Sequence, residues 1–292
     1  MYLEFFGLKM FPFANTADPR FFFANEAHEE ALANMSYAIE HGKGMVLITG
    51  EVGTGKTLVA NVLSLRLRRS ATLVNIGDPL VRGDQLMRCV HQALLGPSAK
   101  KLDRVTMQSS LMDRLIALQR MGQRVAVLVD ESQDLSKGAL EQLRLMSNWE
   151  NHAEKLIQWL LVGQPELRER LQRPEWEHLR QRVVLSFHLQ RLHRDQIGRY
   201  IEHRLRVASG GMTPRVTFEQ PAVFRVAEAS TGAPRLINNI CDAALLTAFA
   251  DEASIVTEAI VESVVREMTT CGWGKQPRSA EGIYRLPVAL AG

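Results

Sequence analysis

Short runs of apolar residues alternate along the first two thirds of the chain with stretches whose apolar positions recur every three or four residues. The runs predict five strands, at 45–49, 71–76, 125–129, 157–163 and 183–187. The stretches between them predict helices at 26–41, 58–63, 83–95, 106–121, 136–149 and 165–181. Strands that are apolar throughout and separated by helices are typical of a parallel sheet covered on both faces. We therefore predict an α/β fold with a parallel five-stranded sheet between helices.

The pattern changes after about residue 190, because strand-like runs disappear. Helical periodicity continues at 195–208, 220–230, 234–250 and 258–268. We therefore predict an α/β core over 26–190 followed by a small all-helical lid domain over 191–270, with the linker at 190–192. An aromatic N-terminal arm at 1–25 precedes the core, and it either covers the sheet edge, folds over a bound base, or does both. A Gly- and Pro-containing tail at 271–292 follows, flexible or bound to a partner.

The strongest chemical signal lies at the end of the first strand, where the chain reads GEVGTGKT. This sequence matches the phosphate-loop pattern G-x-x-x-x-G-K-[ST], in which glycines let successive backbone N–H groups face phosphate oxygens. Lys56 would contact the β- and γ-phosphates, and the Thr57 hydroxyl would coordinate Mg²⁺. The nucleotide-binding residues predicted here are Gly50, Glu51, Val52, Gly53, Thr54, Gly55, Lys56, Thr57 and Leu58. ATP and Mg²⁺ are the predicted cofactors.

A second signal is the pair of carboxylates that follows the apolar strand at 125–129. A strand ending in Asp-Glu is typical of a Walker B element, and it lies about one β-α-β unit beyond the phosphate loop. Asp130 would hold the Mg²⁺ shell opposite Thr57, and Glu131 would orient and polarise the attacking water.

Three further residues are candidates because of their positions in this fold. Gln164 follows the fourth strand, where ligands meet the carboxyl ends of a parallel sheet, although it could simply cap that strand. Arg182, or less favourably Arg180, precedes the fifth strand at the rim and could reach the γ-phosphate of a neighbouring subunit; the alternative is a solvated charge run. Arg235 follows a Gly and a Pro at a helix start and could sense the γ-phosphate from the lid.

Composition and charge exclude few classes of protein. The 292-residue chain is 46% hydrophobic and 23% charged, with a net charge of +3, which neither requires nor excludes a polyanionic partner. Its three widely spaced cysteines, Cys89, Cys241 and Cys271, indicate neither disulfides nor a zinc site. The apolar N-terminus lacks the features of a signal peptide, and no run reaches the ~18–20 apolar residues of a membrane span. We expect a cytoplasmic location, with contact to the inner membrane only through a partner.

Together these blocks resemble an AAA+ ATPase, with Walker A, Walker B, a polar strand-end residue, a rim arginine and a helical lid. The co-linear blocks YLEFFGL, GEVGTGKT, VDESQDL, VGQPEL, LRQRV and GAPRLINNICD resemble the ExeA/GspA-type ATPases more specifically, over about residues 1–270. The resemblance implies an ATPase that partners bacterial envelope machinery, such as type II secretion or pilus biogenesis. Long members continue into a transmembrane segment and a peptidoglycan-binding domain, so this chain is more similar to the short, pilus-associated type, or to a stand-alone ATPase whose membrane partner is another protein.

Three functions remain open at this point. The first is an ATP-hydrolysing factor that forms a ring or filament of identical subunits on ATP and assembles an envelope or pilus complex. The second is a DNA-binding AAA+ regulator of transposition, similar to the TniB and TnsC target selectors. The arginines that could bind DNA, at 168, 170, 173, 180 and 182, are interleaved with glutamates at 166, 169, 175 and 177, which favours an ion-paired helical face over a DNA track. The third is a nucleotide switch without turnover, which Glu131 beside Asp130 disfavours.

Overall fold

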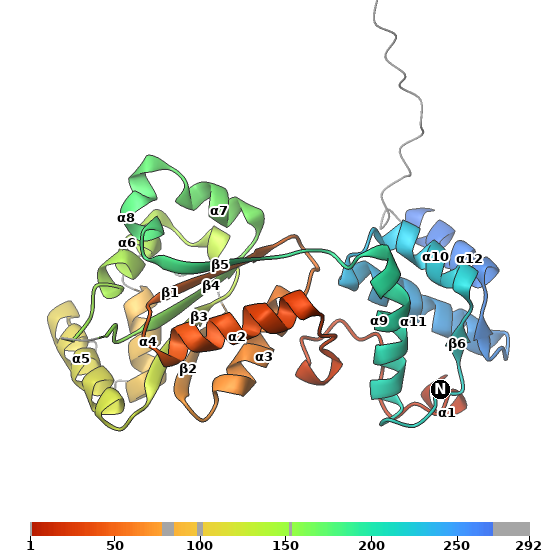
Figure 1. Cartoon of the computed structure of the whole chain (residues 1–292), viewed down its shortest axis with the longest axis horizontal. Helices are drawn as coiled ribbons and strands as arrows, with labels where there is room; N and C mark the ends of the chain where they lie inside the picture. The colour runs from red at the N-terminus through yellow and green to blue at the C-terminus, as the bar shows by residue number, and fades with distance from the viewer. Residues whose placement is uncertain (1, 78–84, 98–101, 152–153, 271–292) are drawn as a thin grey trace, which may run out of the picture.

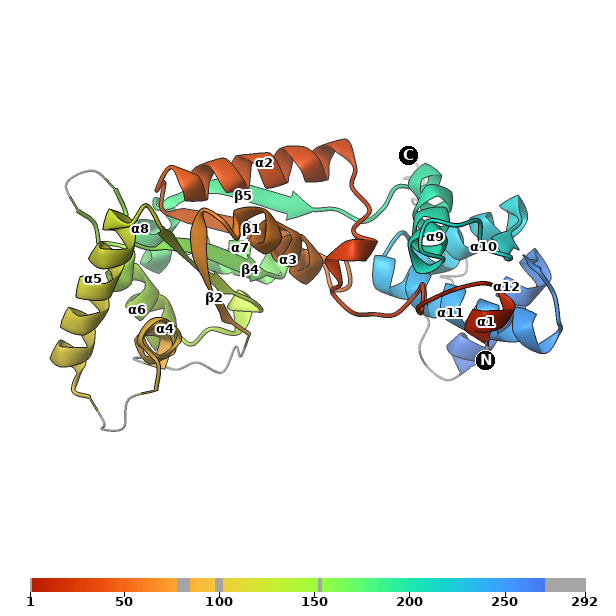
Figure 2. The same cartoon turned by 90° about the horizontal axis from the view of Figure 1, so that it is seen from below.

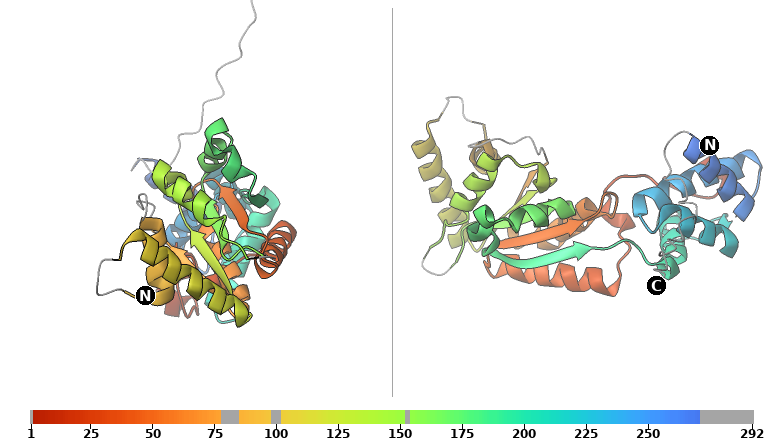
Figure 3. Two further views of the ribbon diagram at one scale, coloured as in Figure 1. Left: turned by 90° about the vertical axis from the view of Figure 1, so that its left-hand side faces the viewer. Right: turned by 90° about the horizontal axis from the view of Figure 1, so that it is seen from above.

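The computed structural model describes residues 2–77, 85–97, 102–151 and 154–270. Two bodies lie side by side along the long axis of the molecule, an α/β part and a helical part (Figure 1). Two chain segments connect them, the one before α2 (Glu26–Glu40) and the one after β5 (Val183–Leu189) (Figure 3). The predicted tail at 271–292, Cys271 and the start of the helix predicted at 83–95 lie outside the described residues. No helix in the described ranges is long and apolar enough to cross a lipid bilayer.

The α/β part contains a five-stranded parallel sheet, as the hydrophobic pattern predicts, in the order β2-β3-β4-β1-β5. Strand β1 is central and pairs with β4 on one side and β5 on the other. All residues of β1 and β4 are buried, because helices cover both faces. The strands are β1 (Met45–Gly50), β2 (Ala71–Ile76), β3 (Arg124–Val129), β4 (Gln158–Gly163) and β5 (Val183–Leu189).

Alternate residues of each strand face opposite layers of the core. Met45 and Leu47 pack into one hydrophobic cluster, whereas Val46 and Ile48 pack into another on the opposite face. The second cluster includes α2, which lies along β5 (Figure 2), and α3. The helices of this part are α2, α3 (Lys56–Leu67), α4 (Gln85–Leu95), α5 (Arg104–Arg120), α6 (Lys137–Met146), α7 (Pro165–Leu171) and α8 (Glu177–Arg180).

The stretch predicted as one helix at 165–181 is broken in the structure. Pro174 forces the preceding Arg173 into an extended conformation, so α7 ends and a 3₁₀ turn (Pro174–Trp176) separates it from α8. The break brings Trp176 and Leu179 into the core beneath β1 and β4. Periodicity alone misses this boundary because both pieces bury apolar residues.

The helical part has a hydrophobic core of its own. A two-residue parallel pairing, β6 (Thr217–Phe218) with β7 (Ile255–Val256), supplements the predicted helices. These strands are too short to produce a recognisable alternation. The helices are α9 (Arg194–Ala208), α10 (Gln220–Ser230), α11 (Pro234–Ala250) and α12 (Glu258–Thr270), joined by the short N-terminal α1 (Tyr2–Phe5).

The aromatic arm packs against the helical part, and the expectation that it covers the sheet edge is wrong. Tyr2, Phe6, Phe13 and Phe21 are buried within the core of the helical part. The Tyr2 hydroxyl also donates a 2.7 Å hydrogen bond to Asp242 of α11. Residues of α9 and α11 share this core with the arm, whereas Phe22 packs against the core of the α/β part.

Buried Arg204 of α9 ties the arm to the helical part. Only 2% of Arg204 is exposed, and its guanidinium donates to the backbone oxygens of Pro12 and Ala14. The group also lies over the Phe21 ring, 4.6 Å from its centroid. Backbone carbonyls and an aromatic face therefore compensate the cost of burying this charge.

Candidate functional site

The predicted phosphate loop connects the end of β1 to the start of α3. Gly53 and Gly55 adopt φ angles of 79° and 95°, in the left-handed region that glycine enters without a steric cost. Gly50 has no room for a side chain, because a Cβ there would lie 2.8 Å from the Leu189 backbone oxygen. Helix α3 begins at Lys56, so its N-terminus points at the loop. This geometry is suited to anions, as the motif predicts.

Lys56 lies beneath this loop and is only 7% exposed. Its ammonium donates to the backbone oxygens of Gly50 at 2.9 Å and Glu51 at 3.0 Å. Burial lowers the pKa of Lys56, whereas the carboxylates of Glu131 and Asp130 raise it. The two carbonyl oxygens are uncharged acceptors, whereas phosphate oxygens that enter the loop would give the Lys56 ammonium a charged one.

Thr57 and Asp130 meet across the site. The Thr57 hydroxyl donates a 2.8 Å hydrogen bond to Asp130 Oδ2, and Asp130 Oδ1 accepts from the Glu131 backbone N–H at 2.9 Å. A hydroxyl and a carboxylate in contact are oxygen ligands of the kind Mg²⁺ prefers, so the residues fit this ion. The described residues contain no cluster of three His, Cys, Asp or Glu side chains able to hold a metal. The remaining ligands of a Mg²⁺ ion here would be phosphate and water.

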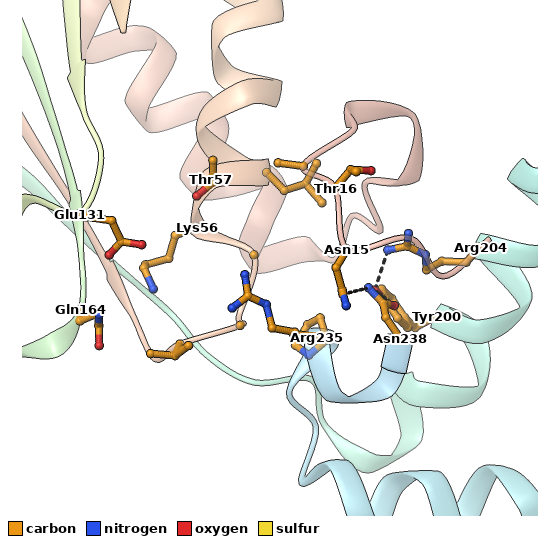
Figure 4. Close-up of a pocket in the computed structure, with 16 residues that line it drawn as sticks. Asn15, Thr16, Lys56, Thr57, Glu131, Gln164, Tyr200, Arg204, Arg235 and Asn238 are labelled. Carbon is orange, nitrogen blue, oxygen red and sulfur yellow. Dashed lines mark hydrogen bonds between the residues drawn. The ribbon is translucent and has the colours of Figure 1, made fainter. Parts of the chain in front are cut away.

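Glu131 and Gln164 line the same pocket from the ends of β3 and β4. Glu131 adopts a φ angle of 47°, which is unfavourable for a residue with a side chain and is found preferentially at functional sites. Gln164 is the N-cap residue of α7, and its backbone N–H donates to Gln133 Oε1 at 3.0 Å. Both predicted residues therefore face the phosphate loop, as Figure 4 shows.

Arg235 reaches the pocket from the helical part. Pro234 begins α11, and the Arg235 backbone N–H donates to the Gly53 oxygen of the phosphate loop at 3.2 Å. A Cβ on Gly53 would lie 2.9 Å from the Arg235 Cβ, so the glycine permits this approach. The guanidinium extends toward Lys56 (Figure 4), and its charge lowers the Lys56 pKa.

The far end of the pocket contains residues that the motifs do not reveal. The Tyr200 hydroxyl donates to Asn238 Oδ1 at 2.9 Å, and Asn238 Nδ2 donates to Asn15 Oδ1 at 3.1 Å. These residues come from α9, α11 and the arm, so no sequence spacing connects them. The pocket is lined by Asn15, Thr16, Ala17, Val52, Gly53, Gly55, Lys56, Thr57, Leu58, Glu131, Gln164, Tyr200, Arg204, Pro234, Arg235 and Asn238.

Comparison with known proteins agrees with this architecture. A family model described as "AAA domain" matches residues 39–171. General secretion pathway protein A of Aeromonas hydrophila is 40% identical over 294 residues, a match that covers the whole of this chain. These two matches support a chain similar to the AAA+ proteins of the ExeA/GspA type. It spans about half the length of that relative, 52%.

Solved structures share the fold of this chain at much lower identity. Cdc6p from Pyrobaculum aerophilum superimposes with a TM-score of 0.67 at 16% identity, covering 88% of this chain and 70% of that one. The ORC2 protein of Aeropyrum pernix gives 0.66 at 16% identity, covering 88% and 71%. RuvB of Thermotoga maritima gives 0.56 at 19% identity, covering 82% and 69%. These likenesses confirm the AAA-type P-loop NTPase fold.

Arg182 lies away from the pocket. It precedes β5 at the end of the sheet where Val183 pairs with Met45, opposite the end that carries the phosphate loop. Its guanidinium donates to Ser147 Oγ and the His178 oxygen, each at 3.0 Å, and to Asn148. Arg180 lies 3.9 Å from Glu177 and is half exposed. Neither arginine can act on the nucleotide of its own chain, so a role in a neighbour's site stays a prediction.

Proposed function

We propose that this protein binds Mg²⁺–ATP and hydrolyses it, and that ATP drives its self-assembly during construction of a bacterial envelope complex. The observation that carries the proposal is the convergence in one pocket of the phosphate loop, Glu131 and Arg235. The Thr57–Asp130 pair adjoins them. A loop alone would support binding only; a carboxylate aimed at the phosphate site supports hydrolysis.

Each residue has a distinct task in this proposal. Lys56 and the backbone N–H groups of the loop hold the β- and γ-phosphates. Thr57 and Asp130 would hold Mg²⁺, which neutralises charge on the phosphates. Glu131 orients the attacking water and accepts its proton, and Gln164 lies where it can contact the γ-phosphate or that water. Arg235 senses the γ-phosphate and couples it to the lid.

The remaining part of the pocket suits the nucleoside. Asn15, Thr16 and Ala17 of the arm line it opposite Tyr200 and Asn238 of the helical part. Amide groups and backbone atoms are suitable hydrogen-bond partners for an adenine edge. The arm and the lid would then both contact the base, so its binding would stabilise their position against the core.

The envelope role rests on the likeness to General secretion pathway protein A, and the type of complex, type II secretion or pilus biogenesis, is part of the proposal. The alternative of a DNA-binding regulator gains no support from the arginines considered for it. Arg170 donates to the backbone oxygens of Gln133 and Leu135, and Arg182 is tied to Ser147. These contacts engage two of the arginines considered, whereas Arg168, Arg173 and Arg180 are exposed.

The test of assembly uses the Glu131→Gln variant, which should retain bound ATP. Sedimentation velocity with Mg²⁺–ATP should show an assembly that Mg²⁺–ADP does not support, and a monomer in both would contradict the proposal. The same samples should bind no duplex DNA across a salt series. ATP-dependent DNA binding that weakens steeply with salt would favour the transposition-type function instead.

The envelope role is tested in the bacterium that encodes the chain. Replacing the gene with the Lys56→Ala variant, at unchanged protein level, should reduce secretion or surface pili. Normal levels of both would exclude this part of the proposal.

A further inference from the structure

Gln133 joins the two strand ends that face the phosphate site. It belongs to the 3₁₀ turn η2 (Ser132–Asp134) that follows β3. Its Oε1 accepts from the backbone N–H of Gln164 at 3.0 Å, and its Nε2 donates to Glu131 Oε2 at 2.8 Å. The same nitrogen lies 3.0 Å from Asp134 Oδ2. One neutral amide therefore connects the proposed water-activating carboxylate to the end of the neighbouring strand β4.

The surroundings of Gln133 favour this arrangement. Gly163, the last residue of β4, has no side chain, and a Cβ there would lie 2.9 Å from Gln133 Oε1. Arg170 of α7 donates to the backbone oxygens of Gln133 at 3.0 Å and Leu135 at 2.5 Å, which holds the turn from below. Gly163 therefore leaves room for the Gln133 side chain, and Arg170 restrains the Gln133 backbone.

Glu131 requires such support because its backbone is strained. Its φ angle of 47° lies in the left-handed region, which is unfavourable for a residue with a side chain, so neighbouring contacts must stabilise it. The amide of Gln133 holds one carboxylate oxygen, Oε2, and Glu131 lines the pocket beside the phosphate loop. A carboxylate restrained in this way loses less freedom when the reaction begins.

We propose that Gln133 is a positioning residue that orients Glu131 and ties it to β4 beside Gln164. The inference rests on the proposed hydrolysis, and it concerns how the base is held rather than whether ATP is bound. Gln133 touches neither nucleotide nor water in this account. It acts through Glu131.

The decisive variant is Gln133→Glu, which keeps the size of the side chain and an oxygen for the Gln164 N–H but loses the donor to Glu131. Its kcat should fall about tenfold to a hundredfold, the effect of losing a hydrogen bond to a charged group. Its KM and ATP affinity should stay within about twofold of wild type, because the phosphate loop is unchanged. A kcat equal to that of wild type would overturn the proposal and leave Gln133 as an anchor only.

Two further measurements separate positioning from folding. Gln133→Ala should lose kcat as Gln133→Glu does, and neither change should lower the residual rate further in a Glu131→Gln background. An additional loss there would mean that Gln133 acts independently of Glu131 and would overturn the proposal.

Gln119→Glu is the matched control. Gln119 on α5 also accepts from one amide, Asn151 Nδ2, and donates to a glutamate, Glu154, remote from the pocket. This control should hydrolyse ATP at the wild-type rate, and a loss equal to that of Gln133→Glu would remove the specificity of the effect and overturn the proposal.

Amide hydrogen exchange without nucleotide tests the contact independently of turnover. The Gln164 N–H should exchange faster in Gln133→Ala than in wild type, and equal rates would overturn the inference even if the wild type hydrolyses ATP. A wild type that shows this contact but no turnover would overturn the proposed function, and with it the positioning role.

Discussion

At the scale of single residues, the most direct prediction concerns the contribution of Lys56 to ATP binding. Its ammonium is buried and hydrogen-bonded to two carbonyl oxygens of the loop that would receive the phosphates. Lys56→Ala should weaken ATP binding about 100-fold or more, because several charge-assisted hydrogen bonds are lost.

Isothermal titration calorimetry measures this effect, with Lys43→Ala as the control. Lys43 is exposed and precedes β1 at the end remote from the loop, so its replacement should leave ATP affinity unchanged. Near-wild-type affinity in Lys56→Ala would refute the phosphate-loop assignment.

The predictability of the site also differs residue by residue. The residues at 50–58, Asp130 and Glu131 follow from local spacing, because each motif is contiguous and lies at a strand end. Gln133 lies within a predicted block, but nothing in the pattern indicates that its side chain turns back to Glu131. Asn15 and Asn238 are 223 residues apart in the sequence, and no local pattern indicates that their side chains meet.

At the scale of elements, one ion pair joins the phosphate loop to the lid. Arg191, just after β5, donates to Glu51 of the loop at 2.7 Å and to the Thr231 hydroxyl before α11. The loop therefore contacts the lid both here and through Arg235. We expect a movement of either part to be transmitted through these contacts.

Arg191→Ala should lower ATP affinity by about two- to fivefold, since a partly exposed ion pair contributes little. It should also broaden the distribution of core–lid distances in small-angle scattering. Arg194→Ala is the control, because Arg194 pairs with Glu228 and lies over the Phe224 ring, both within the helical part. Equal effects of the two changes would refute a specific role for Arg191.

The elements themselves illustrate what periodicity can and cannot predict. The five parallel strands follow from apolar runs alternating with helices, whereas their order in the sheet was not predicted. The break at Pro174 was missed because the apolar spacing continues across it. The destination of the arm was also missed, since its aromatic residues suit any apolar surface and only the folded lid supplies one.

At the scale of the whole molecule, the position of Arg182 predicts that each subunit contributes an arginine to the nucleotide site of its neighbour. It lies at the end of the sheet opposite the phosphate loop, so only another subunit's nucleotide is within its reach. Arg182→Ala should bind ATP normally but hydrolyse it about 10³-fold more slowly, as the loss of an arginine finger does. Arg180→Ala, the control, should retain most activity.

Mixing tests the action between subunits. Assemblies of Arg182→Ala with Glu131→Gln should recover turnover, because one variant keeps an intact Glu131 and the other supplies an arginine. Full activity of Arg182→Ala alone would mean that the contacts to Ser147 and His178 are only structural.

We propose that one pocket both binds and hydrolyses ATP, and phosphate release with Mg²⁺–ATP, measured beside ATP binding for wild type and Glu131→Gln, is the decisive measurement. Wild type should release phosphate, and the variant should lose about 10²-fold or more of this rate at unchanged ATP affinity. Equal turnover by the two proteins would exclude the proposed role of Glu131, and no turnover by wild type would refute hydrolysis in this pocket.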